Sequence, residues 1–135
     1  IAVRPVVPVG MPDPQAAPED AYRAGKAALA KGDARAALAY FRSALRRDPA
    51  YVAALSGAGV ALDQLGRHDL ARPYFEAALA SQPDAPDLMY NLGLSLSMSG
   101  YTDRARALLV RAAARGNDDV KERSTTLLAS LDGAM

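Results

Sequence analysis

The chain has 135 residues and a net charge of +1, and half of its residues are apolar. It contains no cysteine, which excludes disulfides, thiol catalysis and cysteine-ligated metals, and its small net charge provides no long-range field to select nucleic acid or an anionic membrane. Alanine and leucine dominate the apolar fraction while aromatic residues make up only 6% of the chain, so the composition favours closely packed helices.

The N-terminal segment, residues 1–16, differs from the rest of the chain. It reads "IAVRPVVPVGMPDPQA", and its four prolines exclude a helix. We expect an extended, Pro-rich N-terminal arm. Its valines are unusual for a plain linker, so a disordered arm and an arm that docks on the domain, on a partner or on a neighbouring copy all stay open.

Helical patterns follow in chain order from residue 18. They predict six helices, at 18–31, 34–47, 51–65, 68–81, 85–99 and 102–115. Asp84 is expected to cap the fifth, and Pro73 falls early in the fourth. A seventh helix is expected at 118–131, where Leu127, Leu128 and Leu131 form an apolar stripe. None of these runs supplies the ~20 apolar residues of a membrane span.

Small residues recur at a fixed interval of 34 residues. The interval relates Gly25, Gly59 and Gly93; Gly32, Gly66 and Gly100; Ala37, Ala71 and Ala105; Phe41, Phe75 and Leu109; and Ala44, Ala78 and Ala112. Such a period indicates stacked helical hairpins. We interpret the first glycine as a close helix crossing opposite the alanines, the large residue as a filler between hairpins, and the second glycine as a helix end.

The period and these residues resemble the tetratricopeptide repeat (TPR) proteins over residues 18–119. The leucine–glycine pair of that family is present at Leu92 and Gly93, and its closing proline at Pro49 and Pro83. The resemblance implies an all-α fold: a right-handed superhelical stack of three helix-turn-helix repeats, at 18–51, 52–85 and 86–119. With a C-terminal capping helix at 118–131, the domain would span residues 17–132.

The resemblance also implies a partner-binding groove lined by the first helix of each repeat, in a protein-binding scaffold that needs no cofactor. Three tyrosines of this surface could equally pack between repeats, and that alternative stays open. The residues carried over to the groove are Tyr22, Lys26, Leu29, Tyr51, Ser56, Val60, Asp63, Gln64, Tyr90, Asn91, Leu94, Ser97 and Met98.

A finer resemblance concerns residues 90–114, "YNLGLSLSMSGYTDRARALLVRAAA", which are similar to the Tad (tight adherence, Flp pilus) assembly proteins of bacteria. It implies a role in pilus assembly or secretion, a lipid anchor upstream of Ile1, and a place in the bacterial periplasm at the outer membrane. Two alternatives stay open. One is a cytoplasmic TPR-type secretion chaperone, and the other is a homo-oligomer in which the N-terminal arm enters the groove of another copy.

Catalytic and metal sites find little support in the sequence. The single histidine, His68, is interpreted as a solvated turn residue, and no serine stands in a nucleophile motif. Asp118, Asp119 and Glu122 are interpreted as favouring the start of the seventh helix rather than as metal ligands. The arginines of the second and sixth helices are interpreted as solvated faces, and neither nucleic-acid binding nor enzymatic activity is expected.

Overall fold

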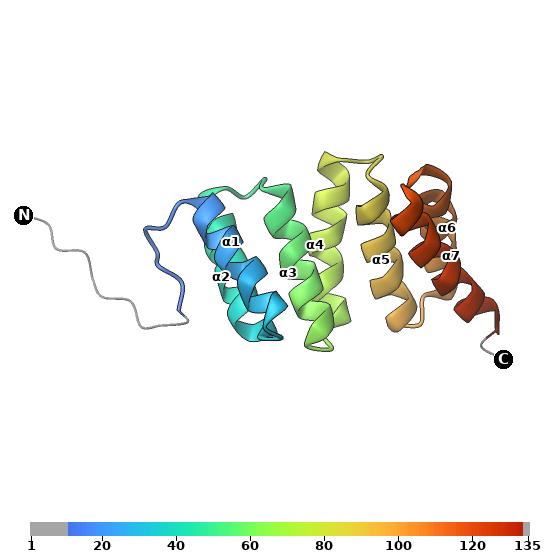
Figure 1. Cartoon of the computed structure of the whole chain (residues 1–135), viewed down its shortest axis with the longest axis horizontal. Helices are drawn as coiled ribbons and strands as arrows, with labels where there is room; N and C mark the ends of the chain where they lie inside the picture. The colour runs from blue at the N-terminus through green and yellow to red at the C-terminus, as the bar shows by residue number, and fades with distance from the viewer. Residues whose placement is uncertain (1–10, 134–135) are drawn as a thin grey trace, which may run out of the picture.

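The computed structural model describes residues 11–133, and this part of the chain contains seven helices and no strand (Figure 1). The helices are α1 (Pro18–Ala30), α2 (Ala34–Arg47), α3 (Val52–Gln64), α4 (His68–Ser81), α5 (Pro86–Met98), α6 (Thr102–Arg115) and α7 (Asp118–Gly133). The expected all-α class is therefore confirmed, and each expected helix is present.

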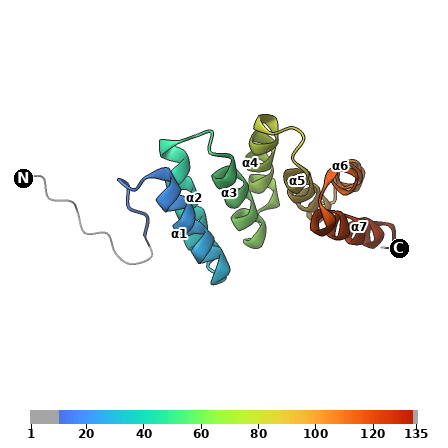
Figure 2. The same cartoon turned by 45° about the horizontal axis from the view of Figure 1, so that its top comes forward.

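The helices pair into three hairpins that stack in sequence order along one axis (Figure 1). Each of α1, α3 and α5 packs against the helix that follows it, and α2 and α4 also pack against the first helix of the next hairpin. The first helices α1, α3 and α5 touch one another in turn. The last helix α7 lies across the end of the third hairpin, against α6 and α5 (Figure 2).

Local sequence explains where the helices begin. Proline at the first position starts α1 and α5, where its missing amide removes no hydrogen bond. Asp33 caps α2 by accepting from the amide of Ala36 at 3.0 Å, and Asn117 caps α7 through the amide of Val120 at 3.0 Å. The expected cap at Asp84 is wrong.

Asp84 serves a different purpose. The residue before α5 is Ala85, which has no side-chain cap, while the Asp84 carboxylate pairs with Arg115 at the end of α6 at 2.8 Å. Asp84 therefore connects two successive hairpins instead of stabilising one helix start.

Three helices end in the same left-handed motif. Gly32, Gly66 and Gly100 have φ angles of 79°, 75° and 85°, a region that glycine adopts without steric cost. In the first hairpin the amide of Gly32 donates to the carbonyl of Leu29 and the amide of Asp33 to that of Ala28, which is the Schellman pattern. The equivalent bonds close α3 and α5. The second repeated glycine is therefore the helix terminator that the sequence predicts.

The first repeated glycine does mark a close helix crossing, but its neighbour is not the one expected. A Cβ atom on Gly25 would lie 2.6 Å from Phe41, and one on Gly59 would lie 2.6 Å from Phe75. The large residue of the second helix, rather than its flanking alanines, occupies the space. The alanines are fully buried on either side of each ring.

The position of Pro73 within the fourth helix is now defined. Pro73 is the sixth residue of α4, beyond the first turn, so α4 lacks the amide that would donate to the carbonyl of Asp69.

In the N-terminal arm, residues 1–10 lie outside the described part of the chain. Residues 13–16 form a turn, with the amide of Ala16 donating to the carbonyl of Asp13 at 3.0 Å, so this stretch is not extended.

Candidate functional site

Two hollows open on the side of the stack that is lined by α1, α3 and α5. They share Val60 of α3, so they form one continuous surface across the three hairpins. We call this surface the groove. Eleven of the thirteen residues that the resemblance assigns to it line one hollow or the other.

The first hollow lies between α1 and α3 and has a volume of about 400 Å³. Tyr22, Lys26 and Leu29 line it from α1, and Ser56 and Val60 from α3. The Lys26 ammonium group lies 5.6 Å from the centre of the Tyr22 ring, a cation–π contact that holds both side chains on the wall of the hollow.

The rim of the first hollow carries opposite charges. Asp87, near the start of α5, lines it together with Lys26 of α1, and both residues are exposed. Neither has an ion-pair partner among residues 11–133. These two charges are therefore available to a bound chain.

The second hollow lies between α3, α5 and α7 and has a volume of about 290 Å³. Its apolar lining includes Leu94 and Met98, and Met98 is 54% exposed although it is a large apolar residue. The other expected residues that line it are Val60, Asp63, Gln64, Tyr90 and Asn91.

Two expected groove residues lie outside both hollows. The Tyr51 ring packs on Tyr22 with centroids 5.3 Å apart, so it supports the wall from the junction between hairpins. Burial raises the pKa of the Tyr51 hydroxyl above its ordinary value of 10.0, and the Glu19 carboxylate raises it further. Ser97 donates its hydroxyl to the Leu94 carbonyl at 2.7 Å within its own helix.

Asp63 makes one contact within its own hairpin and one to the next hairpin. Its Oδ1 atom accepts from the hydroxyl of Ser95 at 2.9 Å and lies 2.8 Å from Nδ1 of His68. His68 is therefore not the solvated turn residue expected, since it begins α4 and only 22% of its side chain is exposed. The carboxylate stands between the serine and the histidine, so no imidazole is placed to take a proton from the fully buried Ser95.

The helix α7 closes the C-terminal end of the groove. Its Arg123 guanidinium lies 4.7 Å from the centre of the Tyr90 ring and pairs with Asp119 at 2.8 Å. Tyr90 is thus covered on one side by α7 while it lines the second hollow on the other. Between the second and third hairpins, Asn91 donates to the Ser56 hydroxyl of α3 at 3.2 Å, which fixes the groove floor.

No group of three or more acidic or histidine side chains is placed to hold a metal ion within 11–133. None of the helices in this range combines the length and the apolar composition of a transmembrane span.

Comparison with protein families gives a match that spans all three hairpins. The model described as "Tetratricopeptide repeat" matches residues 22–86 and again residues 64–120. The chain belongs to the tetratricopeptide repeat family. The groove is therefore the concave surface of a three-repeat TPR domain, and TPR domains generally act as scaffolds rather than as catalysts. A search of proteins with curated functions finds no significant match.

Solved TPR structures share the fold at low sequence identity. The Yersinia enterocolitica type III secretion chaperone SycD, solved with a peptide of the translocator YopD, has a TM-score of 0.77 at 17% identity, over 84% of this chain and 91% of that chain. The Aspergillus fumigatus Sgt2 TPR domain has a TM-score of 0.77 at 22% identity, over 96% and 87%. The first TPR domain of RPAP3, bound to an HSP90 peptide, has a TM-score of 0.77 at 14% identity, over 87% and 94%.

The sequence missed some residues of the TPR groove. Gln82, at the end of α4, and Arg123 of α7 line the hollows although neither lies on a first helix of a repeat. No periodic signal marks them, because one belongs to a connection between repeats and the other to the capping helix. Gly57 also lines the first hollow, and because it has no side chain the Phe41 ring can pack directly against it.

Proposed function

We propose that this TPR domain is a non-catalytic scaffold that holds a peptide or a segment of a partner protein in its groove. The observation that carries the proposal is the pair of hollows joined at Val60, which offer apolar anchoring sites on three successive hairpins. Tyrosine and aliphatic side chains in such positions contribute large contact areas at a small entropic cost.

The side chains that line the hollows indicate which kind of segment would bind. The first hollow has Lys26 and Asp87 on its rim, and the apolar lining of the second includes Leu94, Met98 and Val60. A fitting segment would therefore place one apolar side chain in each hollow and a polar or charged group near the first. A strongly acidic segment is disfavoured, because Asp87 would repel it.

The biological setting that we propose is the assembly of a bacterial Tad/Flp pilus or a related secretion machine, on the resemblance of residues 90–114 to the proteins of that system. The alternative is a cytoplasmic secretion chaperone, a function carried by SycD, whose fold is similar. A cysteine of a lipoprotein signal upstream of Ile1 in the full gene would favour the pilus protein. Its absence from the full gene would favour the chaperone.

The proposed groove is tested by recovering partners from the native cell on immobilised protein. We compare wild type with Leu94→Arg in the second hollow and with Val110→Arg on α6, where Val110 is 53% exposed and lines neither hollow. We expect a protein that wild type and Val110→Arg both retain and Leu94→Arg loses. Equal recovery by all three would contradict binding in the groove.

A second groove variant guards against a folding artefact. Tyr90→Ala removes an anchor without adding charge, although it also removes the ring beneath Arg123. Circular dichroism should report unchanged helix content for each variant, since neither side chain belongs to the fully buried core. We expect Tyr90→Ala to weaken retention of the same protein.

A further inference from the structure

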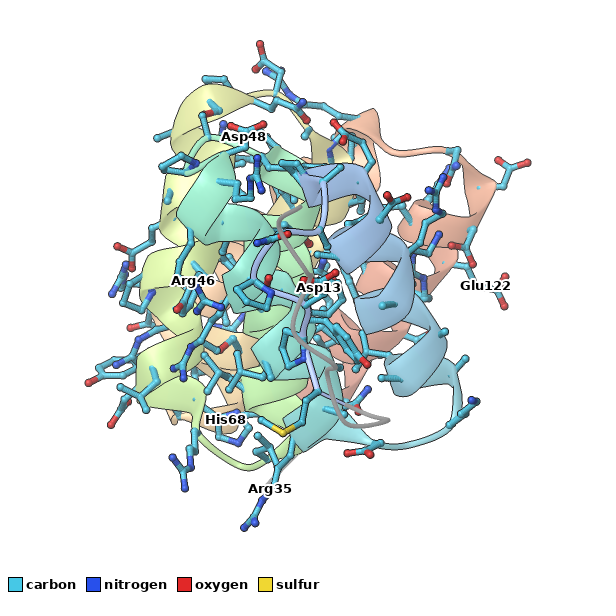
Figure 3. All side chains as sticks on the ribbon, turned by 90° about the vertical axis from the view of Figure 1, so that its left-hand side faces the viewer. Asp13, Arg35, Arg46, Asp48, His68 and Glu122 are labelled. Atoms are coloured by element: carbon cyan, nitrogen blue, oxygen red, sulfur yellow. The ribbon has the colours of Figure 1, made fainter. Side chains whose placement is uncertain are left out.

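The helix α2 carries a row of arginines on the side opposite its buried face. Arg35, Arg42 and Arg46 are separated by seven and four residues, so the α-helical period places them within about 40° of one another over about 16 Å. All three are exposed. In Figure 3, Arg35 and Arg46 lie on the α2 side of the first hairpin, and Glu122 of α7 lies on the opposite side. We call these three residues the arginine row.

The arginine row has no ion-pair partner within the described part of the chain, residues 11–133. Five other arginines pair with aspartates at short distance: Arg23, Arg72, Arg106, Arg115 and Arg123. The three arginines of the row make no ion pair with any residue of 11–133, and α2 contains no acidic residue.

The carboxylates nearest to the row along the sequence, Asp33 and Asp48, form other contacts. Asp33 accepts from the amide of Ala36, and Asp48 accepts from the amide of Ala50 at 3.3 Å. Each carboxylate is held against a backbone amide beside an end of α2, and neither forms an ion pair with the row.

Helix stability does not explain the row. Arg35 is the second residue of α2, near the positive end of the helix dipole, where a cation is unfavourable. The other repeats allow a comparison. The equivalent positions of α4 and α6 hold Asp69 and Asp103, and a negative charge is favourable at that end of a helix. The first repeat therefore carries an arginine where local stability calls for an acid, a departure typical of a functional site.

No other repeat has arginines at the same positions, although α6 carries Arg104, Arg111 and Arg115 at the same spacing one position further along, with Arg115 paired to Asp84. The positions of the row correspond to Asp69, Glu76 and Ala80 in α4 and to Asp103, Val110 and Ala114 in α6. Residues 18–51 contain seven basic and four acidic residues, whereas residues 52–85 contain two basic and four acidic ones. The small net charge of the chain therefore conceals a positive first repeat beside a negative second one.

We propose that the arginine row docks the TPR domain on an anionic lipid surface. Each arginine near such a surface contributes about 1 kcal/mol of binding free energy. An exposed ion pair with a protein partner contributes roughly 0.2–1 kcal/mol. The row would therefore bind an anionic membrane more strongly than an acidic helix. No large apolar side chain lies within the row, so the attachment is electrostatic and weakens as salt is added. It leaves the groove, on the side of α1, α3 and α5, open to a partner.

The test is sedimentation of the full chain with vesicles of phosphatidylcholine alone and of phosphatidylcholine mixed with phosphatidylglycerol. We expect binding to the mixed vesicles only, and reversal by salt. Replacing all three arginines of the row with glutamine should lower the partition coefficient about a hundredfold, at about 1 kcal/mol for each residue and 1.4 kcal/mol for each tenfold change.

A matched control variant distinguishes the effect of aligning three arginines on one helix face from the effect of the total charge. Arg67, Arg104 and Lys121 are exposed, make no ion pair among the described residues and lie in the connection between α3 and α4, on α6 and on α7. Their replacement with glutamine removes the same charge and should leave vesicle binding unchanged. Equal loss in both triple variants would overturn the proposal.

Three further outcomes would also overturn it: binding to neutral vesicles, absence of binding to mixed vesicles, or a row-dependent interaction confined to a glutamate-rich helical peptide. Circular dichroism of both triple variants confirms that the fold is kept. The proposal does not depend on the groove, because recovery of a partner through Leu94 is measured without vesicles.

Discussion

The ring of Phe41 fills the space in which a Cβ atom of Gly25 would stand. The same ring lies 2.6 Å from a Cβ atom built on Gly57 of the next hairpin, so two glycines from successive repeats enclose one aromatic side chain. Phe41 and its equivalent Phe75 are fully buried. The backbone angles of these glycines in α1 and α3 are those of ordinary helix, so any residue could adopt them. Glycine is required there because a side chain would collide with the aromatic ring.

This relationship predicts that Gly59→Ala destabilises the domain. The new Cβ atom would lie 2.6 Å from a ring that has no free space to enter. Overpacking costs about 1–3 kcal/mol, while alanine gains about 1 kcal/mol of helix propensity over glycine. We expect a net loss of up to about 2 kcal/mol in the free energy of unfolding, measured by urea denaturation.

A double-mutant cycle with Phe75→Leu isolates the cause. The third repeat already combines Gly93 with Leu109, whose Cγ would lie 2.9 Å from a built Cβ, so leucine is a natural occupant of this position. Gly59→Ala should cost less in the Phe75→Leu background than in wild type, because the smaller side chain can yield. Equal costs in the two backgrounds would show that the ring is not responsible.

The glycines that end helices should respond for a different reason. A Cβ atom on Gly66 would meet nothing within 4 Å, but its φ angle of 75° is unfavourable for other residues. We expect Gly66→Ala to lower the free energy of unfolding by about 1–2 kcal/mol through backbone strain. Gly66→Asn should cost less, because asparagine tolerates this conformation, and a cost as large as that of alanine would argue against strain as the cause.

The fold could be predicted because its determinants are periodic. The 34-residue interval identified the repeated small positions, yet it could not say which residue faces which. The alanines were therefore assigned the contact that Phe41 and Phe75 make. Gly57 was missed for the same reason, since its equivalent in the third repeat is Asn91 and no period marks it. The pairing of Asp84 with Arg115 joins residues 31 positions apart and has no local signature.

The groove was partly predictable, since the first helix of a repeat presents a fixed face to the concave side. The exceptions depend on contacts between hairpins. Tyr51 was expected at the surface and instead packs on Tyr22, and Asp63 was expected to be available and instead binds Ser95 and His68. Such contacts follow from how hairpins approach one another, which a single sequence does not specify.

Asp63 should therefore contribute to stability as much as to binding. Asp63→Ala would leave the buried hydroxyl of Ser95 without its acceptor, and an unsatisfied buried group costs about 1–3 kcal/mol. We expect a loss of this size in the free energy of unfolding by urea. Asp63→Asn keeps an oxygen acceptor and should lose less, so an alanine variant as stable as wild type would show that the contact is unimportant.

The last prediction concerns the ionisation of Tyr51. Burial and the Glu19 carboxylate raise the pKa of its hydroxyl above 10.0, so the folded state favours the neutral phenol. This contribution to stability is complete below about pH 10 and is lost as the pH rises through the folded-state pKa. The difference between the phenolate absorbance titrations of wild type and Tyr51→Phe isolates this group. In Glu19→Gln its pKa should fall below the wild-type value yet stay above 10.0, and an unchanged titration would remove Glu19 as a cause.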